Sequence, residues 1–326
     1  MLTELPTLCT RVVDTEPWHF RRLPLAPDEI LDSEIESIRL EFCCNFDTWR
    51  SATTTKANIS LEIPGKNHIH SHAVFTRRGR WRPHYPMGGI TFSCDGKHHC
   101  YHLIIRQPED VDHGKLGEMT DLSMEELFAG ETWNYRILNS ITNVCLRTHS
   151  LSISLSFSDR GEIHTQAIVA EDISLAQFAR GQEPSDLEEG AIEAVDLFNL
   201  QFLQSLIGNA DYFFDYNEQF RFTAHNVAAF RFGHRLVPFP YDIQFSVVLT
   251  PRYQRHRHFS PEQEAQINAE AISFMIQRIP HATDIRYIDQ ALTQACSSLE
   301  KAEMPIRLQD RYMTYIRVFS ESLTRK

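Results

Sequence analysis

The amino-acid sequence predicts an α+β protein in which a strand-rich N-terminal half precedes a mainly helical C-terminal half. Apolar residues alternate with polar ones in several segments before residue 172, whereas they recur with helical period from residue 187 onward. The chain has 326 residues, of which 42% are hydrophobic, so it is large enough to bury two medium-sized cores. We therefore expect two lobes with a cleft between them, namely an N-terminal extension at 1–30, a strand-rich lobe at 31–172 and a helical lobe at 173–326.

Period-two alternation predicts the strands of the N-terminal half. Residues 35–42 alternate, and residues 58–63 repeat the pattern before a Pro-Gly turn at 64–65. Residues 68–75 follow that turn and should form a hairpin with the preceding strand. The other predicted strands are residues 89–93, 99–106, 151–157 and 164–170, the last two joined by a turn at 159–161.

Capping residues and apolar stripes predict the helices. Residues 123–126 read Ser-Met-Glu-Glu, a capping-box pattern, so one helix should begin near Ser123, and a separate, longer helix is predicted over residues 131–142. An apolar stripe predicts a further helix from residue 187 that ends near Gly208. The last helices are expected over residues 260–323, with Pro261 at the first helical position and breaks at Pro280 and Pro305.

Charge and composition exclude several classes of protein. The formal net charge of -11 argues against general nucleic-acid binding, because such binding depends on Lys and Arg neutralising phosphates. No apolar stretch is long enough to predict membrane insertion, and the first 22 residues lack the pattern of an export signal. The seven irregularly spaced cysteines are typical of reduced thiols, so we expect a soluble, cytoplasmic protein.

Several polar residues lie at the predicted ends of apolar elements between residues 198 and 246, where a rigid scaffold can present side chains to a cleft. Phosphoryl transfer needs one carboxylate that orients or deprotonates the acceptor hydroxyl. It also needs an Asn and a second Asp that hold Mg²⁺ on the nucleotide phosphates. Asp211, Asn226 and Asp242 provide these side chains in that order. Taken one at a time, each of these residues also fits a purely structural role as a cap or turn residue.

The motifs around these residues resemble a family of uncharacterised bacterial proteins and, more distantly, the CotH-type and HipA-type atypical kinases. LIGNAD at 206–211, HN at 225–226 and PYDIQFS at 240–246 are similar to the family pattern IGN-x-D, HN and PYDFD-[FYW]-S. Three upstream segments add weaker similarity. They are TRRGRWR at 76–82, ETWNYRILNSIT at 131–142 and AEDISLAQFAR at 170–180.

This resemblance implies a two-lobed kinase-like fold and a nucleotide-binding site. It implies that Asp211 is the catalytic aspartate, that Asn209 supports its loop, and that Asn226 and Asp242 bind Mg²⁺. The remaining implied positions are Arg78, Gly79 and Arg80 over the ATP phosphates, and Glu131 on the helix that pairs with a phosphate-binding base. The implied activity is ATP-dependent transfer of phosphate to a hydroxyl group of a protein or a small molecule.

Two departures from the family pattern leave a second function open. Gln244 replaces the second Asp of the PYDFD motif, and residues 85–90 lack the basic residue found there in the family. The phosphate-binding base could instead be Lys97 or Arg106. A pseudokinase that binds a partner without catalysis is therefore the alternative from a different class.

Histidine spacing gives a third hypothesis, a transition-metal site. Residues with side chains on one face of each strand would be the ligands. They are His68, His70 and His72 on one strand, and His98, Cys100 and His102 on another. The hypothesis requires the two strands to be neighbours in the sheet.

Overall fold

The computed structural model contains two compact units, each built from segments that are separated in sequence. Unit 1 comprises Met1–Leu25, Ala129–Leu146 and Arg180–Lys326, and unit 2 comprises Ala26–Phe128 and Arg147–Ala179. The structure describes residues 12–13, 31, 37–62, 69–77, 86–94, 97–106, 118–173, 192–209, 213–216, 222–232, 235–241, 243, 246–252, 259–278 and 285–324. The expected α+β class is confirmed. Residues 129–146, which we expected in the strand-rich lobe, belong to unit 1, and the predicted lobe boundaries stay predictions.

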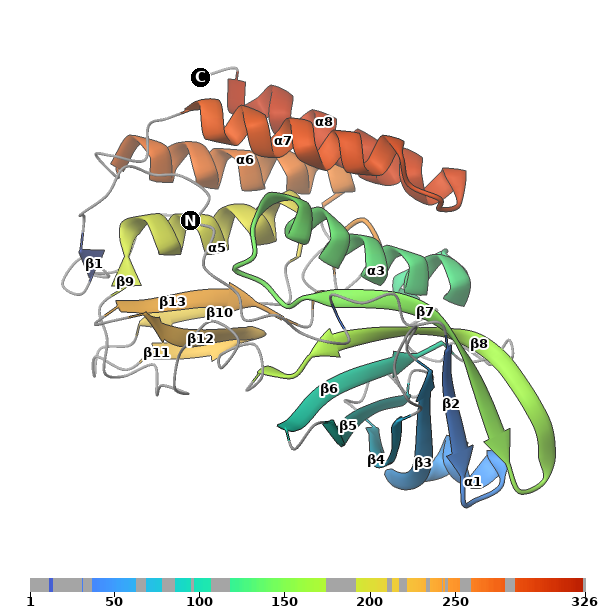
Figure 1. Cartoon of the computed structure of the whole chain (residues 1–326). Helices are drawn as coiled ribbons and strands as arrows, with labels where there is room; N and C mark the ends of the chain where they lie inside the picture. The colour runs from blue at the N-terminus through green and yellow to red at the C-terminus, as the bar shows by residue number, and fades with distance from the viewer. Residues whose placement is uncertain are drawn as a thin grey trace. The chain divides into compact units, whose positions relative to one another are not determined.

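Unit 2 is a sheet that closes on itself (Figure 1). Its strand order is β2-β3-β4-β5-β6-β8-β7, and all neighbours are antiparallel except β2 and β7, which pair in parallel and close the sheet. The strands are β2 Ser37–Phe42, β3 Thr54–Glu62, β4 Ile69–Arg77, β5 Pro86–Cys94, β6 Lys97–Ile105, β7 Thr148–Phe157 and β8 Arg160–Glu171. Each predicted strand of the N-terminal half is found, with its ends shifted by a few residues.

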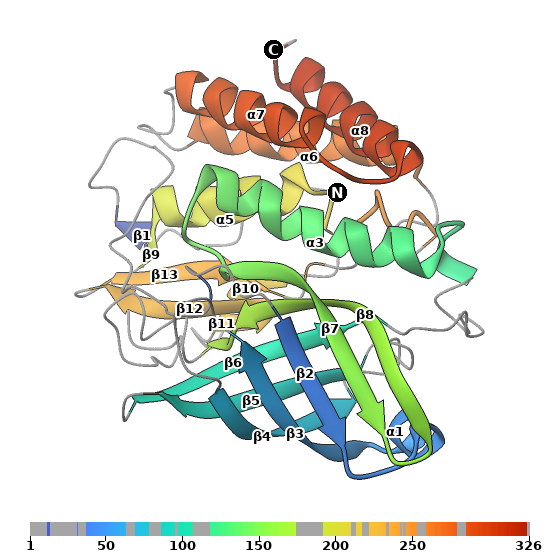
Figure 2. The same ribbon diagram turned by 45° about the vertical axis from the view of Figure 1, so that its right-hand side comes forward.

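Alternate residues of the described strands form one apolar cluster, as period-two alternation requires. β2 alternates buried and exposed residues, and its inward residues Ile38, Leu40 and Phe42 belong to one apolar cluster with residues of β3, β6, β7 and β8. The short helix α1, Phe46–Ser51, adds Phe46 and Trp49 to this cluster, beside Phe42 and Phe157. Figure 2 shows α1 near one end of the strands.

Unit 1 combines helices with small strand pairs. β1 Val12–Val13 pairs in parallel with β9 Ile192–Glu193, which leads directly into α5 Ala194–Leu206. Two antiparallel hairpins follow, β10 Phe213–Tyr216 with β11 Phe222–His225, and β12 Val227–Phe232 with β13 Arg235–Pro240. The C-terminal helices are α6 Pro261–Arg278, α7 Ile285–Glu300 and α8 Ile306–Thr324, and α6 and α7 each pack against α8. The helix that starts at Pro261 and the break at Pro305 are confirmed.

The helix α3, Met124–Ile141, corrects one prediction. The capping box at its start is formed, because the Glu126 carboxylate accepts the Ser123 N–H at 2.7 Å and Ser123 Oγ accepts the Glu126 N–H at 3.1 Å. The two helices predicted in this region are one helix that continues through Gly130. A side chain at Gly130 would meet Leu249, at 2.1 Å from its Cδ2 atom, so this glycine allows close packing and does not end the helix. No helix in the described part of the chain is long and apolar enough to cross a bilayer.

Candidate functional site

The β12–β13 hairpin places Asn226 next to the segment that carries Asp242. Val227 and Pro240 are partners at the open end of this hairpin, and the Tyr241 N–H donates to the Asn226 carbonyl at 3.1 Å. Asp242 itself lies outside the described residues. It is the next residue in the sequence after Tyr241. The hydrogen bond from Tyr241 therefore brings Asn226 next to the residue that precedes Asp242, and the binding of Mg²⁺ by Asn226 and Asp242 stays a prediction.

Asn226 has an unusual backbone conformation, with φ of 56°. This left-handed region is unfavourable for residues other than Gly, and Asn is among the side chains that tolerate it best. The residue is 5% exposed, so its amide group is held within the fold. Both properties fit a side chain with a fixed position at the hairpin entrance.

The end of α5 is built as a Schellman motif, which fixes the position of Asn209. Gly208 has φ of 65°, its N–H donates to the Ser205 carbonyl at 3.1 Å, and the Asn209 N–H donates to the Gln204 carbonyl at 2.9 Å. The side-chain Nδ2 of Asn209 also donates to Gln204 Oε1 at 2.9 Å. The backbone and the amide of Asn209 are therefore both tied to α5, and its predicted support of the loop that carries Asp211 stays a prediction.

A second backbone contact joins this loop to the segment after Asp242. Asn209 and Ser246 form an antiparallel bridge, and the Val247 N–H donates to the Gly208 carbonyl at 2.8 Å. Within unit 1, Tyr241 therefore contacts Asn226 before Asp242 in the sequence, and Ser246 contacts Asn209 after it. Asp211 follows Asn209 by two positions and lies outside the described residues. Its approach to Asp242 stays a prediction.

Glu131 lies on α3 and is buried, with 2% of its surface exposed. Its negative charge is one of the influences that raise the pKa of Tyr312 on α8 above the ordinary value of 10.0, so it lies near that hydroxyl group. The main cause of this raised pKa is burial of Tyr312, and a hydrogen bond from Ser246 acts in the opposite direction. The expected pairing of Glu131 with a phosphate-binding base stays a prediction.

Tyr312 belongs to a buried hydrogen-bond network that joins α8 to α3. Its single hydroxyl proton is shared between the Gly130 carbonyl oxygen at 2.9 Å and Asn134 Oδ1 at 2.7 Å. Asn134 Nδ2 in turn donates at 2.8 Å to the carbonyl of Ile243, the residue that follows Asp242. The network ties α3 and α8 to the segment of the proposed metal ligand. Sequence reasoning missed Tyr312 and Asn134, although a tyrosine within an apolar helical stripe indicates a hydroxyl that needs a buried partner.

The Tyr312→Phe variant is expected to lower the free energy of unfolding by about 1–3 kcal/mol, because two buried acceptors lose their donor. Chemical denaturation followed by circular dichroism measures this difference. The raised pKa adds a pH dependence. Above pH of about 10 the unfolded chain releases the tyrosine proton first, so the stabilisation is complete below that pH and decreases above it.

The difference between the two proteins should therefore shrink at alkaline pH. Tyr287→Phe is the control, because the Tyr287 side chain is exposed and its replacement should change stability by less than about 0.5 kcal/mol. A Tyr312→Phe protein as stable as the natural one at pH 7 would contradict the network.

The basic residues expected near the phosphates are only partly described. Arg78, Gly79 and Arg80 lie outside the described residues. Arg106 in unit 2 forms an ion pair with Glu125 at 3.7 Å, and its carbonyl accepts the Thr165 hydroxyl at 2.8 Å. Its assignment as the phosphate-binding base stays a prediction, as does that of Lys97.

The histidine arrangement required for a transition-metal site is not found. β4, which carries His70 and His72, and β6, which carries Cys100 and His102, are separated by β5. His72 and Cys100 both pair with Thr91 from opposite sides, which puts them about 10 Å apart across two strand spacings. His102 is instead hydrogen-bonded to Asp172. Among the described residues, no three His, Cys, Asp or Glu side chains are placed to hold a metal ion.

Sequence comparisons leave the candidate site to be judged on its geometry. No model of a known protein family matches the chain, and no curated protein is significantly similar to it. The hairpin entrance at Asn226 and the loop at Asn209 are therefore the main basis for a functional proposal.

Proposed function

We propose that unit 1 binds the phosphates of ATP through Mg²⁺ and belongs to a kinase-like phosphotransferase that acts on a hydroxyl group of a protein or small molecule. The observation that supports this proposal best is the hydrogen bond from Tyr241 to Asn226. It joins Asn226 to Tyr241, the residue that precedes Asp242 in the sequence. In kinases an Asn and an Asp hold Mg²⁺. The two-lobed kinase-like fold implied by the resemblance is part of the proposal.

The donor set fits Mg²⁺. This ion prefers oxygen ligands and keeps several waters, so one carboxylate from Asp242 and one amide oxygen from Asn226 are enough to bind it with nucleotide phosphates. When bound, the ion neutralises charge on the β- and γ-phosphates. Asp211 would orient the acceptor hydroxyl and take its proton as the oxygen attacks the γ-phosphorus, while the bond to the β-phosphate oxygen breaks and ADP leaves.

A second function, nucleotide binding without transfer, is favoured by Gln244. Gln244 stands where the resembling family has a second Asp, so the metal would have one negative charge fewer beside it. Binding of Mg²⁺ and ATP can persist with one carboxylate, whereas phosphoryl transfer depends strongly on charge stabilisation.

Thermal unfolding with ATP and Mg²⁺ tests the proposal. A ligand at about one hundred times its Kd should raise the free energy of unfolding by about 2.7 kcal/mol. We expect this stabilisation for the natural protein and for Asp211→Ala, and its loss in Asp242→Ala. Asp310→Ala removes an exposed aspartate on α8 and is the matched control.

Release of labelled phosphate from γ-labelled ATP, or its transfer to an acceptor, separates the two functions. Turnover that is lost in both Asp211→Ala and Asp242→Ala supports phosphotransfer. Stabilisation by ATP without turnover in any variant supports the second function. If millimolar ATP with Mg²⁺ leaves the unfolding of the natural protein unchanged, both functions are wrong.

A further inference from the structure

A groove runs along α7 and α8 in unit 1, and none of the residues described as lining it belongs to the candidate site. It has a volume of about 950 Å³ and is lined by one face of each helix. On α7 the lining residues recur at helical spacing from Asp289 to Glu300, and on α8 from Asp310 to Glu321. Eleven positions on a helix correspond to about 16 Å, so the groove extends over about three helical turns.

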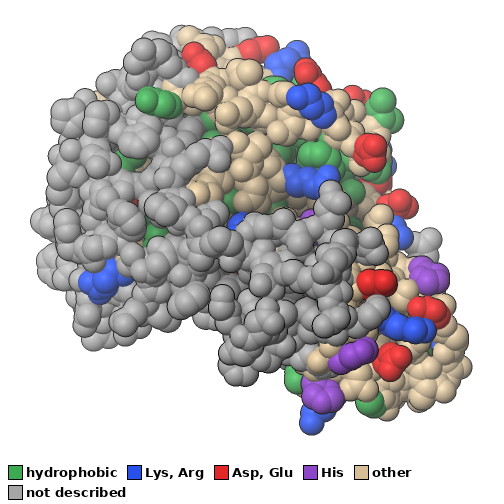
Figure 3. Space-filling view, in the orientation of Figure 1, with side chains coloured by type: hydrophobic (Ala, Val, Ile, Leu, Met, Phe, Trp, Pro, Cys, Tyr) green, Lys and Arg blue, Asp and Glu red, His purple; other side chains and the backbone are tan. Residues whose placement is uncertain are grey.

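The two ends of the groove are acidic. Gln309 Nε2 donates to the Leu299 carbonyl at 2.6 Å, so the start of α8 lies beside the end of α7. Glu300 and Asp310 therefore lie at one end, and because the helices run in opposite directions, Asp289 and Glu321 lie at the other. Among the described residues that line the groove, Arg317 is the only basic one. Figure 3 shows acidic side chains, with basic ones among them, along the upper margin where Figure 1 places these helices.

The floor between the acidic ends is apolar. Leu292 and Ile316 are buried, and Cys296 and Met313 are half-buried and partly open to solvent. Methionine and cysteine side chains are polarisable, and methionine is common on surfaces that accept helices. Burial of these apolar surfaces by another molecule would be favourable.

The remaining lining residues have short side chains. Thr293, Ser297, Thr314 and Ser320 carry hydroxyl groups and no long side chain that would fill the groove. The distance between packed helices depends on the side chains at their contact, so short ones allow a third helix to approach closely. The dimensions and the apolar floor both suit a helix of about three turns.

We infer that the α7–α8 groove binds a basic amphipathic helix of a partner protein. The described lining of the groove includes four acidic residues and one basic residue, so a helix with Lys or Arg near both ends of its apolar face would complement it. A symmetric contact with a second copy of this chain would bring these acidic ends against each other, which is unfavourable. This inference is independent of nucleotide binding.

A pair of synthetic peptides tests this inference. The first is an 18-residue peptide of Leu, Ala and Lys with one apolar face and Lys residues eleven positions apart, and the second has Glu in place of each Lys. Fluorescence anisotropy of labelled peptides measures their binding to the full-length protein. We expect the Lys peptide to bind and the Glu peptide not to bind, and added salt should weaken the binding.

Charge reversal locates the binding surface. Asp289→Lys with Glu321→Lys should raise Kd about tenfold, because two ion pairs are lost and replaced by repulsion. The control is Glu262→Lys with Glu303→Lys, two exposed residues outside the groove whose reversal changes the net charge equally. Ser297→Trp should also weaken binding, because its indole would occupy the groove without any change of charge.

Three results would overturn the inference. They are equal binding of both peptides, equal weakening by the control reversal, and failure of the Lys peptide to bind the natural protein. Light scattering adds a fourth. A dimer of the natural protein that Ser297→Trp converts to a monomer would assign the groove to a second copy. Circular dichroism of each variant checks that it is folded.

Discussion

The Gly208→Ala variant is expected to lower the free energy of unfolding of the protein by about 2–5 kcal/mol. Gly208 has φ of 65°, which is unfavourable for any residue with a Cβ atom. A Cβ atom would also lie 2.7 Å from Val247 Cγ1 and 3.0 Å from Cζ of the Tyr315 ring. Both distances are shorter than normal contacts, so either the backbone or its neighbours must move.

The Tyr315 ring has little freedom to move away from a new Cβ atom at residue 208. Its hydroxyl donates to the Ser205 carbonyl at 2.7 Å and accepts from Asn268 Nδ2 at 2.9 Å. The strain should therefore fall on the contact between Gly208 and Val247, which also positions Asn209 and Ser246. If the proposed function is correct, ATP should stabilise this variant less than the natural protein.

Gly161→Ala is the matched control for this prediction. A Cβ atom at Gly161, on the hairpin of β7 and β8, would meet nothing within 4 Å. Its replacement should change the free energy of unfolding by less than about 0.5 kcal/mol. Urea denaturation of both variants gives the comparison. Equal losses of stability in the two variants would show that the close contacts around Gly208 do not cause the loss in Gly208→Ala.

Features that depend on a few neighbouring residues could be predicted from the sequence. The capping box at Ser123, the helix end near Gly208 and the hairpin of β7 and β8 all follow from local backbone and hydrogen-bond preferences. The apolar alternation of β2 correctly indicated which residues face the core. Two helices were predicted where α3 is one, and the contact of Gly130 with Leu249, far along the chain, could not be foreseen.

Long-range pairing could not be predicted in the same way. The sheet closes through the parallel pair of β2 and β7, in which Leu40 lies opposite Leu155. Both strands have the same alternation as their neighbours, so no local pattern identifies this partner. The candidate site has the same division. Motifs in the sequence led to the prediction of Asn209 and Asn226, whereas the network of Tyr312 and Asn134 depends on helices brought together by packing.

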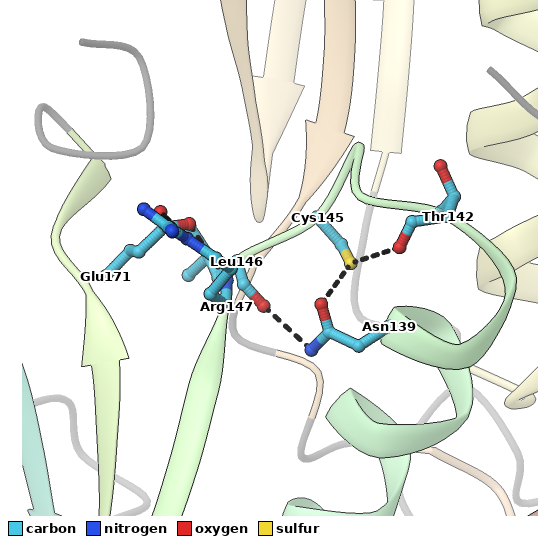
Figure 4. A network of polar contacts seen from close by, with 6 residues as sticks. All are labelled: Asn139, Thr142, Cys145, Leu146, Arg147 and Glu171. Carbon is cyan, nitrogen blue, oxygen red and sulfur yellow. Dashed lines mark hydrogen bonds and ion pairs between the residues drawn. The ribbon is translucent and has the colours of Figure 1, made fainter. Parts of the chain in front are cut away.

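The Glu171→Ala variant is expected to lower the free energy of unfolding by about 3–5 kcal/mol, because it leaves a largely buried cation without its partner. Glu171 is fully buried, and the side chain of Arg147 is 12% exposed. Figure 4 shows the two residues facing each other across β7 and β8. Glu171 Oε1 accepts from Arg147 Nε at 2.6 Å, and Oε2 accepts the Arg147 N–H at 2.9 Å. The carboxylate therefore satisfies both the charge and the backbone of Arg147.

The size of this effect should depend on the burial of the ion pair, and a variant that lacks both charges can show this. Arg147→Met with Glu171→Leu removes both charges and should recover much of the stability lost in Glu171→Ala, since an apolar pair of similar volume needs no charged partner. The exposed pair of Arg39 and Glu162, at 3.4 Å, provides the comparison, and its loss should cost less than about 1 kcal/mol. Urea denaturation at neutral pH measures the free energy of unfolding of four proteins. They are the natural protein, Glu171→Ala, the double variant and a variant that lacks Glu162. If removing Glu171 lowers the free energy of unfolding no more than removing Glu162 does, the buried ion pair does not stabilise the pairing of β7 and β8.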